Sequence, residues 1–437
     1  MKIKKIRQKI HSLLTKYHEQ SIKNQTFIPG KTKVRYSGAY YDEKELKAMT
    51  DTMLDGWFGL GIRGELFEQK LTEYIGSRST LVTNSGSSAS LLCMAALTSD
   101  LYSERIEKGS EIITPSCTFA TTVAAIVHKN LVPVFIDIDL DTYNINLKTL
   151  ERAISKKTKA MFIPHTLGNP NNMDILMKIA KKYKLHVIED NCDALGSEYD
   201  GRKTGSFGVL ATCSFYPAHH ITMAGEGGAV FINDPRLHRI VLTYRNWGRG
   251  CWCNSTEKSQ NGACGHRFDF KIDGVPIDHK YYFITLGYNL KPIEIQAAMG
   301  LVQLKKFPKM AVARRKNFAA FYDFFQGYEK FFVLPKSPKK ANPCWFGFPL
   351  TIRNDAPFSR PDITSFLENR LIETRTVFAG NLVRHPAMKR VNYRVVGDLA
   401  NSDKVLKDTF FIGIGPHLNS KHISYIKEVF TKFFKAY

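Results

Sequence analysis

Residues 213–230 read CSFYPAHHITMAGEGGAV, two apolar runs joined by a glycine-rich turn. The first run alternates like the end of a buried strand, and Pro217 ends its ladder pairing. Three glycines allow a tight turn before the second apolar run, residues 228–232. His219 and His220 lie between the two runs. Because neighbouring residues of extended backbone point to opposite faces, we expect only one of the two imidazoles to face a site.

Strand and helix patterns alternate from about residue 79 to residue 234. The expected strands cover residues 80–83, 111–114, 132–138, 159–164, 186–189 and 211–215. Helical patterns between them cover residues 87–97, 119–128 and 173–183. Such alternation predicts an α/β fold with a mainly parallel sheet covered on both faces. Ligands of open α/β sheets bind beyond the carboxyl ends of the strands, so we expect the site there.

A short serine- and glycine-rich segment follows the first expected strand. Residues 84–89 read NSGSSA and open a helix. Free backbone N–H groups at a helix start, with small residues and hydroxyls around them, suit a phosphate. Ser87 could equally be an ordinary helix N-cap, since serine is a preferred capping residue.

Chain length and composition indicate a globular protein and argue against a membrane-spanning or secreted one. The chain has 437 residues, of which 43% are hydrophobic, enough for two or three domains. No apolar run is long enough to cross a bilayer, and the basic, helix-patterned residues 1–20 lack the core of a signal peptide. We therefore expect a cytoplasmic protein whose N-terminal helix is a packing arm, a membrane-surface helix being the alternative.

The formal net charge of +22 suggests an anionic partner. No recognised nucleic-acid-binding motif accompanies the charge, so we expect no specific nucleic acid. An anionic substrate or an acidic redox partner would also be attracted by this positive charge. Most of the lysines are expected to be solvated surface residues.

The chain has eight cysteines. A cytoplasmic enzyme of this size does not need disulfides, so a cluster of cysteines suggests metal or redox chemistry. Cys251, Cys253 and Cys264 lie within fourteen residues, and Cys192 lies beside Asp190. Zinc knuckles favour Cys-x2-Cys turns, which a single intervening residue fits poorly. The other four are interpreted as small buried hydrophobes: Cys93, Cys117, Cys213 and Cys344.

The segment Ser214-Phe215-Tyr216-Pro217 resembles the cofactor-lysine region of the sugar aminotransferases of fold type I, which use pyridoxal phosphate (PLP). In that family the pattern is Ser-Phe-aromatic-Pro-x-Lys, and the lysine binds the cofactor covalently. Here the lysine position is His219, and no lysine occurs between Lys203 and Lys258. Imidazole cannot replace a primary amine in this bond. The chain is thus similar to the branch of sugar 3-dehydratases that use pyridoxamine phosphate (PMP), an aminotransferase altered at its lysine being the alternative.

The resemblance also implies roles for residues around the cofactor. Asp190 would bond the pyridinium nitrogen and keep it protonated, and Phe119 would stack on the ring unless it only packs in the core. Asp193 stands where aminotransferases carry a neutral or imidazole side chain, a departure that the dehydratase branch shares. The remaining expected cofactor contacts are Gly86, Ser87 and Ser214 at the phosphate, Tyr216, and Asn289, which would reach the cofactor phosphate of the second subunit of a homodimer.

The four cysteines are similar in arrangement to those of the iron–sulfur dehydratases that act on CDP-4-keto-6-deoxyglucose. Their last gap is a few residues shorter than the gap before Cys264. The resemblance implies a 2Fe–2S cluster bound by Cys192, Cys251, Cys253 and Cys264. Non-covalently bound PMP would lose a methylene proton to His219, the C3 hydroxyl of a nucleotide-linked keto sugar would leave, and the cluster would then pass electrons singly. No NAD fingerprint occurs in the chain, so an NAD(P)H-dependent iron–sulfur flavin reductase would be a separate partner.

The resemblance implies a large domain with a mainly parallel sheet and a smaller α+β C-terminal domain. We expect an N-terminal helical arm in residues 1–34, a cofactor-binding domain in 35–305 with the cysteine loop near 251–264, and the small domain in 306–437. In the small domain, Phe348 and Arg375 are candidates for binding the nucleotide sugar. Two readings other than an aminotransferase remain: a cluster-free 3-dehydratase, and a basic regulatory or nucleic-acid-binding protein on the same fold.

Overall fold

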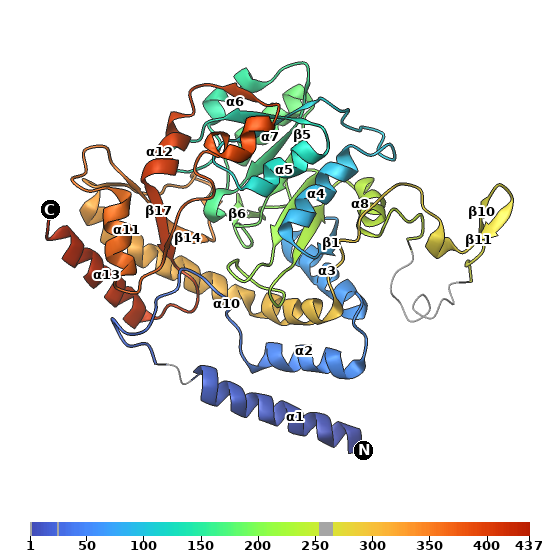
Figure 1. The fold of residues 1–437 in the computed structure, drawn as a ribbon, viewed down its shortest axis with the longest axis horizontal. Helices are drawn as coiled ribbons and strands as arrows, with labels where there is room; N and C mark the ends of the chain where they lie inside the picture. The colour runs from blue at the N-terminus through green and yellow to red at the C-terminus, as the bar shows by residue number, and fades with distance from the viewer. Residues whose placement is uncertain (1, 24–25, 253–264) are drawn as a thin grey trace.

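An eight-stranded sheet forms the centre of the molecule (Figure 1). The computed structural model describes residues 2–23, 26–252 and 265–437. In spatial order the strands are β1 (Ser79–Thr83), β9 (Gly228–Ile232), β8 (Leu210–Ser214), β5 (His186–Asp190), β4 (Thr158–Pro164), β2 (Glu111–Pro115), β3 (Val132–Ile136) and β16 (Arg394–Val396). All neighbours are parallel except that β9 runs antiparallel to both β1 and β8. The predicted strands are confirmed, and the tight turn after residue 224 reverses the chain into β9.

Helices cover both faces of this sheet, as the alternation predicts. One face packs against α4 (Gly86–Leu97), α5 (Ala120–His128) and α8 (Leu237–Arg245). The other face packs against α3 (Ile62–Ile75), α6 (Leu147–Ala153), α7 (Met173–Tyr183) and the first half of α10 (Glu294–Phe325). Because both faces are covered, the central strands are largely apolar, and all five residues of β8 and of β9 are buried.

The small domain is an antiparallel sheet with an aromatic core. Its strands are ordered β12 (Phe332–Val333), β14 (Gly347–Ile352), β17 (Thr409–Gly413) and β15 (Thr374–Arg375). It packs against α11 (Arg360–Glu368), α12 (Ala400–Asp408), α13 (Ser420–Phe434) and the second half of α10. The predicted boundary at 305/306 falls inside α10, which runs along both domains (Figure 1). One strand of the C-terminal region, β16, completes the edge of the large sheet instead.

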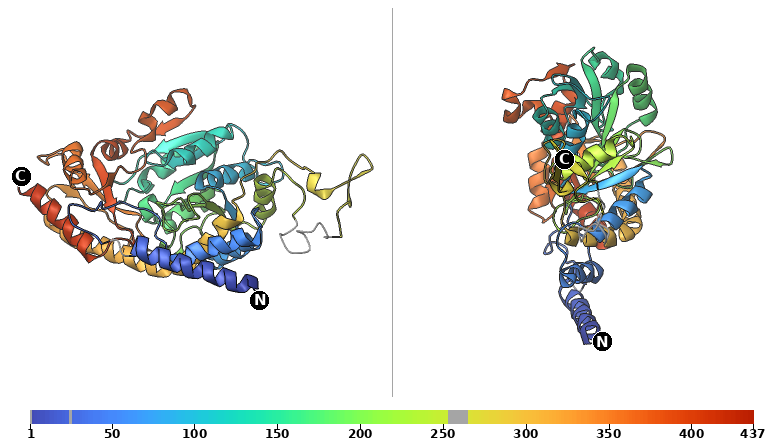
Figure 2. Two further views of the ribbon diagram at one scale, coloured as in Figure 1. Left: turned by 60° about the horizontal axis from the view of Figure 1, so that its bottom comes forward. Right: turned by 90° about the vertical axis from the view of Figure 1, so that its right-hand side faces the viewer.

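The N-terminal arm is a helix that packs on the body of the protein. Helix α1 (Lys2–His18) lies along α2 (Glu43–Asp55), as the views in Figure 2 show. Arg7 donates to Asp55 at 2.7 Å and His11 Nε2 lies 2.9 Å from Asp51 Oδ1. This is the packing arm that the sequence predicts. Among the described residues, no helix is both long and apolar enough to cross a membrane.

The remaining elements are short. They are η1 (Glu19–Lys23), η2 (Thr166–Gly168), η3 (His279–Tyr281), η4 (Gln326–Tyr328), η5 (Leu382–Arg384) and η6 (Pro386–Arg390), with the strands β6 (Glu198–Tyr199), β7 (Arg202–Lys203), β10 (Phe270–Ile272), β11 (Val275–Ile277) and β13 (Ala341–Asn342). The β10–β11 hairpin extends away from the body of the molecule (Figure 1).

Candidate active site

A cavity of about 610 Å³ opens at the carboxyl ends of the parallel strands, between the large and the small domain. Asp190 ends β5, Ser214 ends β8, and the segment after β1 supplies Gly86. The edge of the sheet thus gathers residues that are more than a hundred positions apart in sequence. The predicted site residues that line the cavity are Gly86, Ser87, Phe119, Asp190, Cys192, Asp193, Ser214, Tyr216, His219 and Arg375.

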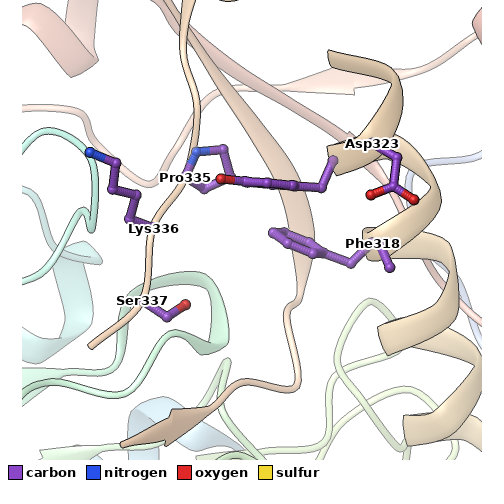
Figure 3. A pocket seen from close by; sticks show the side chains of 7 residues that line it. Phe318, Asp323, Pro335, Lys336 and Ser337 are labelled. Atoms are coloured by element: carbon purple, nitrogen blue, oxygen red, sulfur yellow. The ribbon is translucent and has the colours of Figure 1, made fainter. Parts of the chain in front are cut away.

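A second hollow of about 470 Å³ lies on the small-domain surface, where Phe318 and Asp323 on α10 face Pro335, Lys336 and Ser337 (Figure 3). It is the more open of the two. None of the residues predicted for the site lines it. We therefore place the candidate active site in the larger cavity.

The start of α4 lies at the cavity, where the sequence predicts a phosphate site. Ser85 is the N-cap, and its hydroxyl accepts a hydrogen bond from the Ser88 N–H at 3.1 Å. Ser87 is therefore not the cap, and it stays exposed at the cavity. A Cβ added to Gly86 would lie 2.7 Å from the Cβ of Ser214 and 3.2 Å from the sulfur of Cys192. Only glycine fits this close approach, which suits a phosphate bound at a helix N-terminus.

Asp190 is held as a carboxylate acceptor at the floor of the cavity. Thr122 on α5 donates to its Oδ2 at 2.6 Å, and Thr212 on β8 donates to its Oδ1 at 3.3 Å. The Cys192 N–H donates to the same Oδ1 at 3.2 Å. The side chain is 7% exposed. A buried side chain that accepts from this many donors is fixed in place, as contact with a protonated ring nitrogen requires.

His219 lies at the cavity, and the neighbouring His220 points away from it. His219 Nδ1 is 3.2 Å from Asp193 Oδ1, and these side chains are 18% and 7% exposed. The two atoms do not yet have hydrogen-bond geometry, and Asp193 Oδ2 has no hydrogen-bond partner in the described chain. A catalytic pair is often this loose before ligand binds. His220 is 1% exposed and donates from Nε2 to the Cys344 carbonyl at 2.7 Å, which confirms that only one imidazole faces the site.

Aromatic rings and one cation form the walls of the cavity. Phe119 is 53% exposed on its rim and contacts Phe378 edge to face, so it is not a core residue. Tyr216 is 49% exposed, with its ring centroid 6.5 Å from that of His219. The Arg375 guanidinium lies 4.4 Å from the ring centroid of Tyr36.

The structure does not bring Phe348 to the cavity, and this expectation is corrected. Phe348 is fully buried in the small-domain core, where it packs on Phe318, Phe321 and Phe325. Phe346, two residues earlier, lines the cavity instead, with its ring 5.4 Å from that of His219. Phe348 lies inside β14, whose residues are all buried between the sheet neighbours and α10.

Asn289 and Cys251 lie outside the cavity. Asn289 is exposed and forms an isolated backbone bridge with Asn246.

Cys251 is partly buried, and Cys253 and Cys264 fall outside the described residues. Burial and the Asp190 charge raise the pKa of the Cys192 thiol well above its usual range. In the described ranges, no group of three or more His, Cys, Asp or Glu side chains could hold a metal ion.

Several residues that line the cavity are not among those predicted from the sequence. Tyr36, His165, Glu226 and Phe346 all face the cavity, and Thr122 fixes Asp190. Thr122 had a usable signal, since it is a polar residue three positions after Phe119 at the start of a predicted helix. Tyr36 had none, because only the folding of the small domain brings residue 36 near residue 375.

The sequence is similar to a known family and to several named relatives. Residues 39–431 match the DegT/DnrJ/EryC1/StrS aminotransferase family. The chain is 43% identical to "Lipopolysaccharide biosynthesis protein RfbH" of Salmonella typhimurium over 98% of both chains. It is 42% identical to dTDP-4-dehydro-2,6-dideoxy-D-glucose 3-dehydratase of Saccharopolyspora spinosa, over 95% of this chain and 90% of the relative.

Solved structures show the same fold. E. coli GDP-4-keto-6-deoxy-D-mannose-3-dehydratase with bound hydrated PLP superposes with a TM-score of 0.81 at 29% identity, over 91% of this chain and 100% of that one. The fold is therefore that of the fold-type I PLP-dependent enzymes, as predicted, and the family supports PLP or PMP as the cofactor. Together with the family match over most of its length, this means that the chain belongs to the DegT/DnrJ/EryC1/StrS aminotransferase family.

Proposed function

We propose that the protein is a PMP-dependent 3-dehydratase that removes the C3 hydroxyl of a nucleotide-linked 4-keto-6-deoxyhexose. The observation that carries the proposal is His219, which stands in the cavity at the position of the family's lysine. No lysine is among the residues that line this part of the described structure. The relatives named as 3-dehydratases and as a lipopolysaccharide biosynthesis protein support this class of reaction. We assign CDP-4-keto-6-deoxy-D-glucose as the substrate and 3,6-dideoxysugar synthesis for O-antigen as the pathway.

The residues of the cavity fit a phosphorylated pyridine. Gly86, Ser87 and Ser214 would hold the phosphate, Asp190 the ring nitrogen, and Phe119 and Tyr216 the ring and its surroundings. The unpartnered Asp193 oxygen is a further acceptor for a polar group of the ligand. When bound, PMP supplies an amine that combines with the C4 carbonyl of the sugar and a methylene that can lose a proton.

His219 is the base for that methylene proton. An imidazole is an effective base near neutral pH because its ordinary pKa is about 6.5. Asp193 would orient the ring once its 3.2 Å contact with Nδ1 becomes a hydrogen bond, which leaves Nε2 free to take the proton. A lysine would return the proton to sugar C4 and complete a transamination, whereas a base that is not bonded to the cofactor permits loss of the C3 hydroxyl. Arg375, a fixed cation on the cavity wall, is placed to bind the diphosphate of the substrate.

We further propose that Cys192, Cys251, Cys253 and Cys264 bind a 2Fe–2S cluster. The support is their spacing in the sequence and the position of Cys192 in the wall of the cavity. Such a cluster supplies the one-electron transfers that deoxygenation requires, and an NAD(P)H-dependent iron–sulfur flavin reductase would feed it. An anaerobic spectrum with iron and sulfide assays tests the assignment directly. Cys253→Ser should keep proton exchange at the cofactor methylene and lose net deoxygenation, and normal turnover by this variant would refute the cluster.

The dehydratase proposal is tested by incubating the protein with PMP and the keto sugar in deuterated water. We expect deuterium exchange at the cofactor methylene and release of the C3 oxygen. Borohydride reduction of the PLP-loaded protein should leave no cofactor attached to a lysine. A lysine adduct on a tryptic peptide, or formation of a 4-amino sugar as the main product, would identify an aminotransferase instead.

A further inference from the structure

Beside His219 lies a second, small space whose lining includes several polar side chains and shares only His219 with the active-site cavity. It leaves about 10 Å³ for the centre of a water molecule, close to the minimum that one buried water needs. His219, His220, Thr222 and Arg314 line it. Residues 38–40, from the start of the large domain, close its other side. The space therefore joins the proposed base to α10, the helix that carries Arg314.

Besides His219 Nδ1, which faces Asp193, three buried atoms of the residues that line this space lack a hydrogen-bond partner in the described chain. They are His220 Nδ1, Thr222 Oγ1 and Arg314 Nε, and their residues are only 1%, 2% and 2% exposed. Buried polar atoms are nearly always satisfied by protein or by ordered water, because an unpaired one costs about 1–3 kcal/mol. Three such atoms around one small space indicate a common partner.

The donor and acceptor characters of the three atoms are complementary. His220 Nε2 must carry a proton because it donates to the Cys344 carbonyl at 2.7 Å. Its Nδ1 is then an acceptor, since burial and the positive charge of Arg314 lower the pKa of His220 well below its usual range and keep the ring neutral. Arg314 Nε can only donate, and the Thr222 hydroxyl can do either. One water can accept from Arg314, donate to His220 and bond Thr222.

The same residues also support the ring of His219. Arg314 Nη1 donates to the Phe346 carbonyl at 3.1 Å, and the Phe346 ring packs against both imidazoles, with centroids 5.4 Å from His219 and 6.2 Å from His220. A shift of Arg314 would therefore move the aromatic wall of the base.

We propose that this space holds one structural water bound by Arg314, His220 and Thr222, and that Arg314 and Thr222 act through it as positioning residues for the base His219. The inference rests on the proposed function, because it is for methylene proton removal that the ring must be fixed. It adds a support on the side of His219 that Asp193 does not reach.

A high-resolution crystal structure of the full-length protein tests the water itself. We expect a single density peak within hydrogen-bond distance of Arg314 Nε, His220 Nδ1 and Thr222 Oγ1. In Thr222→Val, which keeps the shape and removes only the hydroxyl, the peak should be lost or displaced and the His219 ring should become less ordered. A wild-type structure in which the three atoms bond one another directly would overturn the proposal.

Kinetics test the positioning role. Thr222→Val should slow methylene exchange by about tenfold or more, as misplacing a catalytic group does, with little change in the affinity for PMP. Thr222→Ser, which restores the hydroxyl, should recover most of the rate. The matched control is Thr114→Val, which removes another fully buried, unpaired hydroxyl away from this space and should exchange at the wild-type rate.

The outcomes separate the two proposals. If the wild-type protein shows no methylene exchange, the proposed function fails, while the water remains testable by crystallography. If the wild-type protein exchanges and Thr222→Val matches its rate, the positioning role alone is wrong. Equal slowing of Thr222→Val and Thr114→Val would show a general packing effect and would likewise refute it.

Discussion

His219 differs from the family's lysine in what it can hold and what it can remove. A lysine at this position would bind the cofactor covalently. With an imidazole there, the cofactor would be bound only through its phosphate, ring nitrogen and ring face. The surrounding residues are arranged for that task, since Asp193 lies 3.2 Å from Nδ1 and Phe346 packs on the ring. If the proposed function is right, the residue type at position 219 decides which of two related reactions the cavity supports.

Replacing His219 by asparagine removes the base but keeps a polar side chain of similar reach. We expect methylene exchange to fall by about 10²- to 10⁴-fold, the usual contribution of a general base. PMP should still bind with nearly unchanged affinity, because the phosphate and ring-nitrogen contacts lie on other residues. Exchange measured by NMR and binding measured by absorbance titration check this, and exchange at the wild-type rate would assign the base elsewhere.

His220 makes stability depend on pH. Its pKa in the folded protein lies well below its usual range because of burial and the charge of Arg314, whereas the unfolded chain titrates near 6.5. Above pH 6.5 both states are neutral and the residue contributes no pH dependence. Below it only the unfolded state takes up the proton, so the free energy of unfolding should fall by up to about 1.4 kcal/mol per pH unit.

The measurement for His220 is chemical unfolding between pH 8 and pH 5, compared between the wild-type protein and His220→Gln. Glutamine can still donate to the Cys344 carbonyl but does not titrate, so its curve should be flatter over that range. Parallel curves would mean that other groups dominate the acid destabilisation.

At the level of elements, the proposed phosphate cradle lies at the junction of β1, α4 and β8. The N-cap Ser85 begins α4, and Gly86 lets that helix start directly against Ser214 at the end of β8. The reversal into β9 holds the same junction from the other side, because Gly228 lies against the backbone of Ser85. A parallel sheet brings such strand ends together without long-range pairing of the loops themselves.

Gly86→Ala tests the cradle. Its Cβ would lie 2.7 Å from the Ser214 Cβ, so the helix start must shift and the phosphate site must open. We expect PMP affinity to fall by about tenfold or more, since 1.4 kcal/mol is a factor of ten. Gly59→Ala, where nothing lies within 4 Å of the new Cβ, is the control and should bind normally. Unchanged affinity in Gly86→Ala would place the phosphate elsewhere.

At the level of the whole molecule, the cavity is closed by parts that are far apart in the chain. The small domain contributes Phe346 and Arg375, and the segment before α2 contributes Tyr36. Asn289 is exposed outside the cavity of its own chain. Its predicted role therefore requires a second copy of the protein, and a homodimer remains our proposal.

Mixing two inactive variants tests this role. If Asn289 serves the partner's cofactor, a heterodimer of His219→Asn and Asn289→Asp has one intact site. Random reassociation should then restore about a quarter of the wild-type turnover, since half of the dimers are mixed and each has one working site of two. Turnover no higher than that of the separate variants would mean that Asn289 acts within its own chain or not at all.

Much of the fold was predictable because the central strands are short, apolar and separated by helical patterns. Residues 213–230 even predicted the turn that leads into β9. The direction of β9 and the addition of β16 to the sheet edge were not predictable, because strand pairing depends on contacts between distant segments. The domain boundary was placed inside α10 because the sequence signals where helices occur and not which sheet each half of a helix packs against.

For the site, the sequence by itself determined which chemical groups are available. They are a histidine at the position of the family's lysine, an aspartate at the end of β5, and a glycine at the start of α4. Tertiary structure alone decided which side chains meet them. It buried Phe348 and exposed Phe346 to the cavity, turned His220 inward, and set Thr122 on Asp190. The physical reason is that residue type fixes what a group can do, while packing of distant elements fixes where it points.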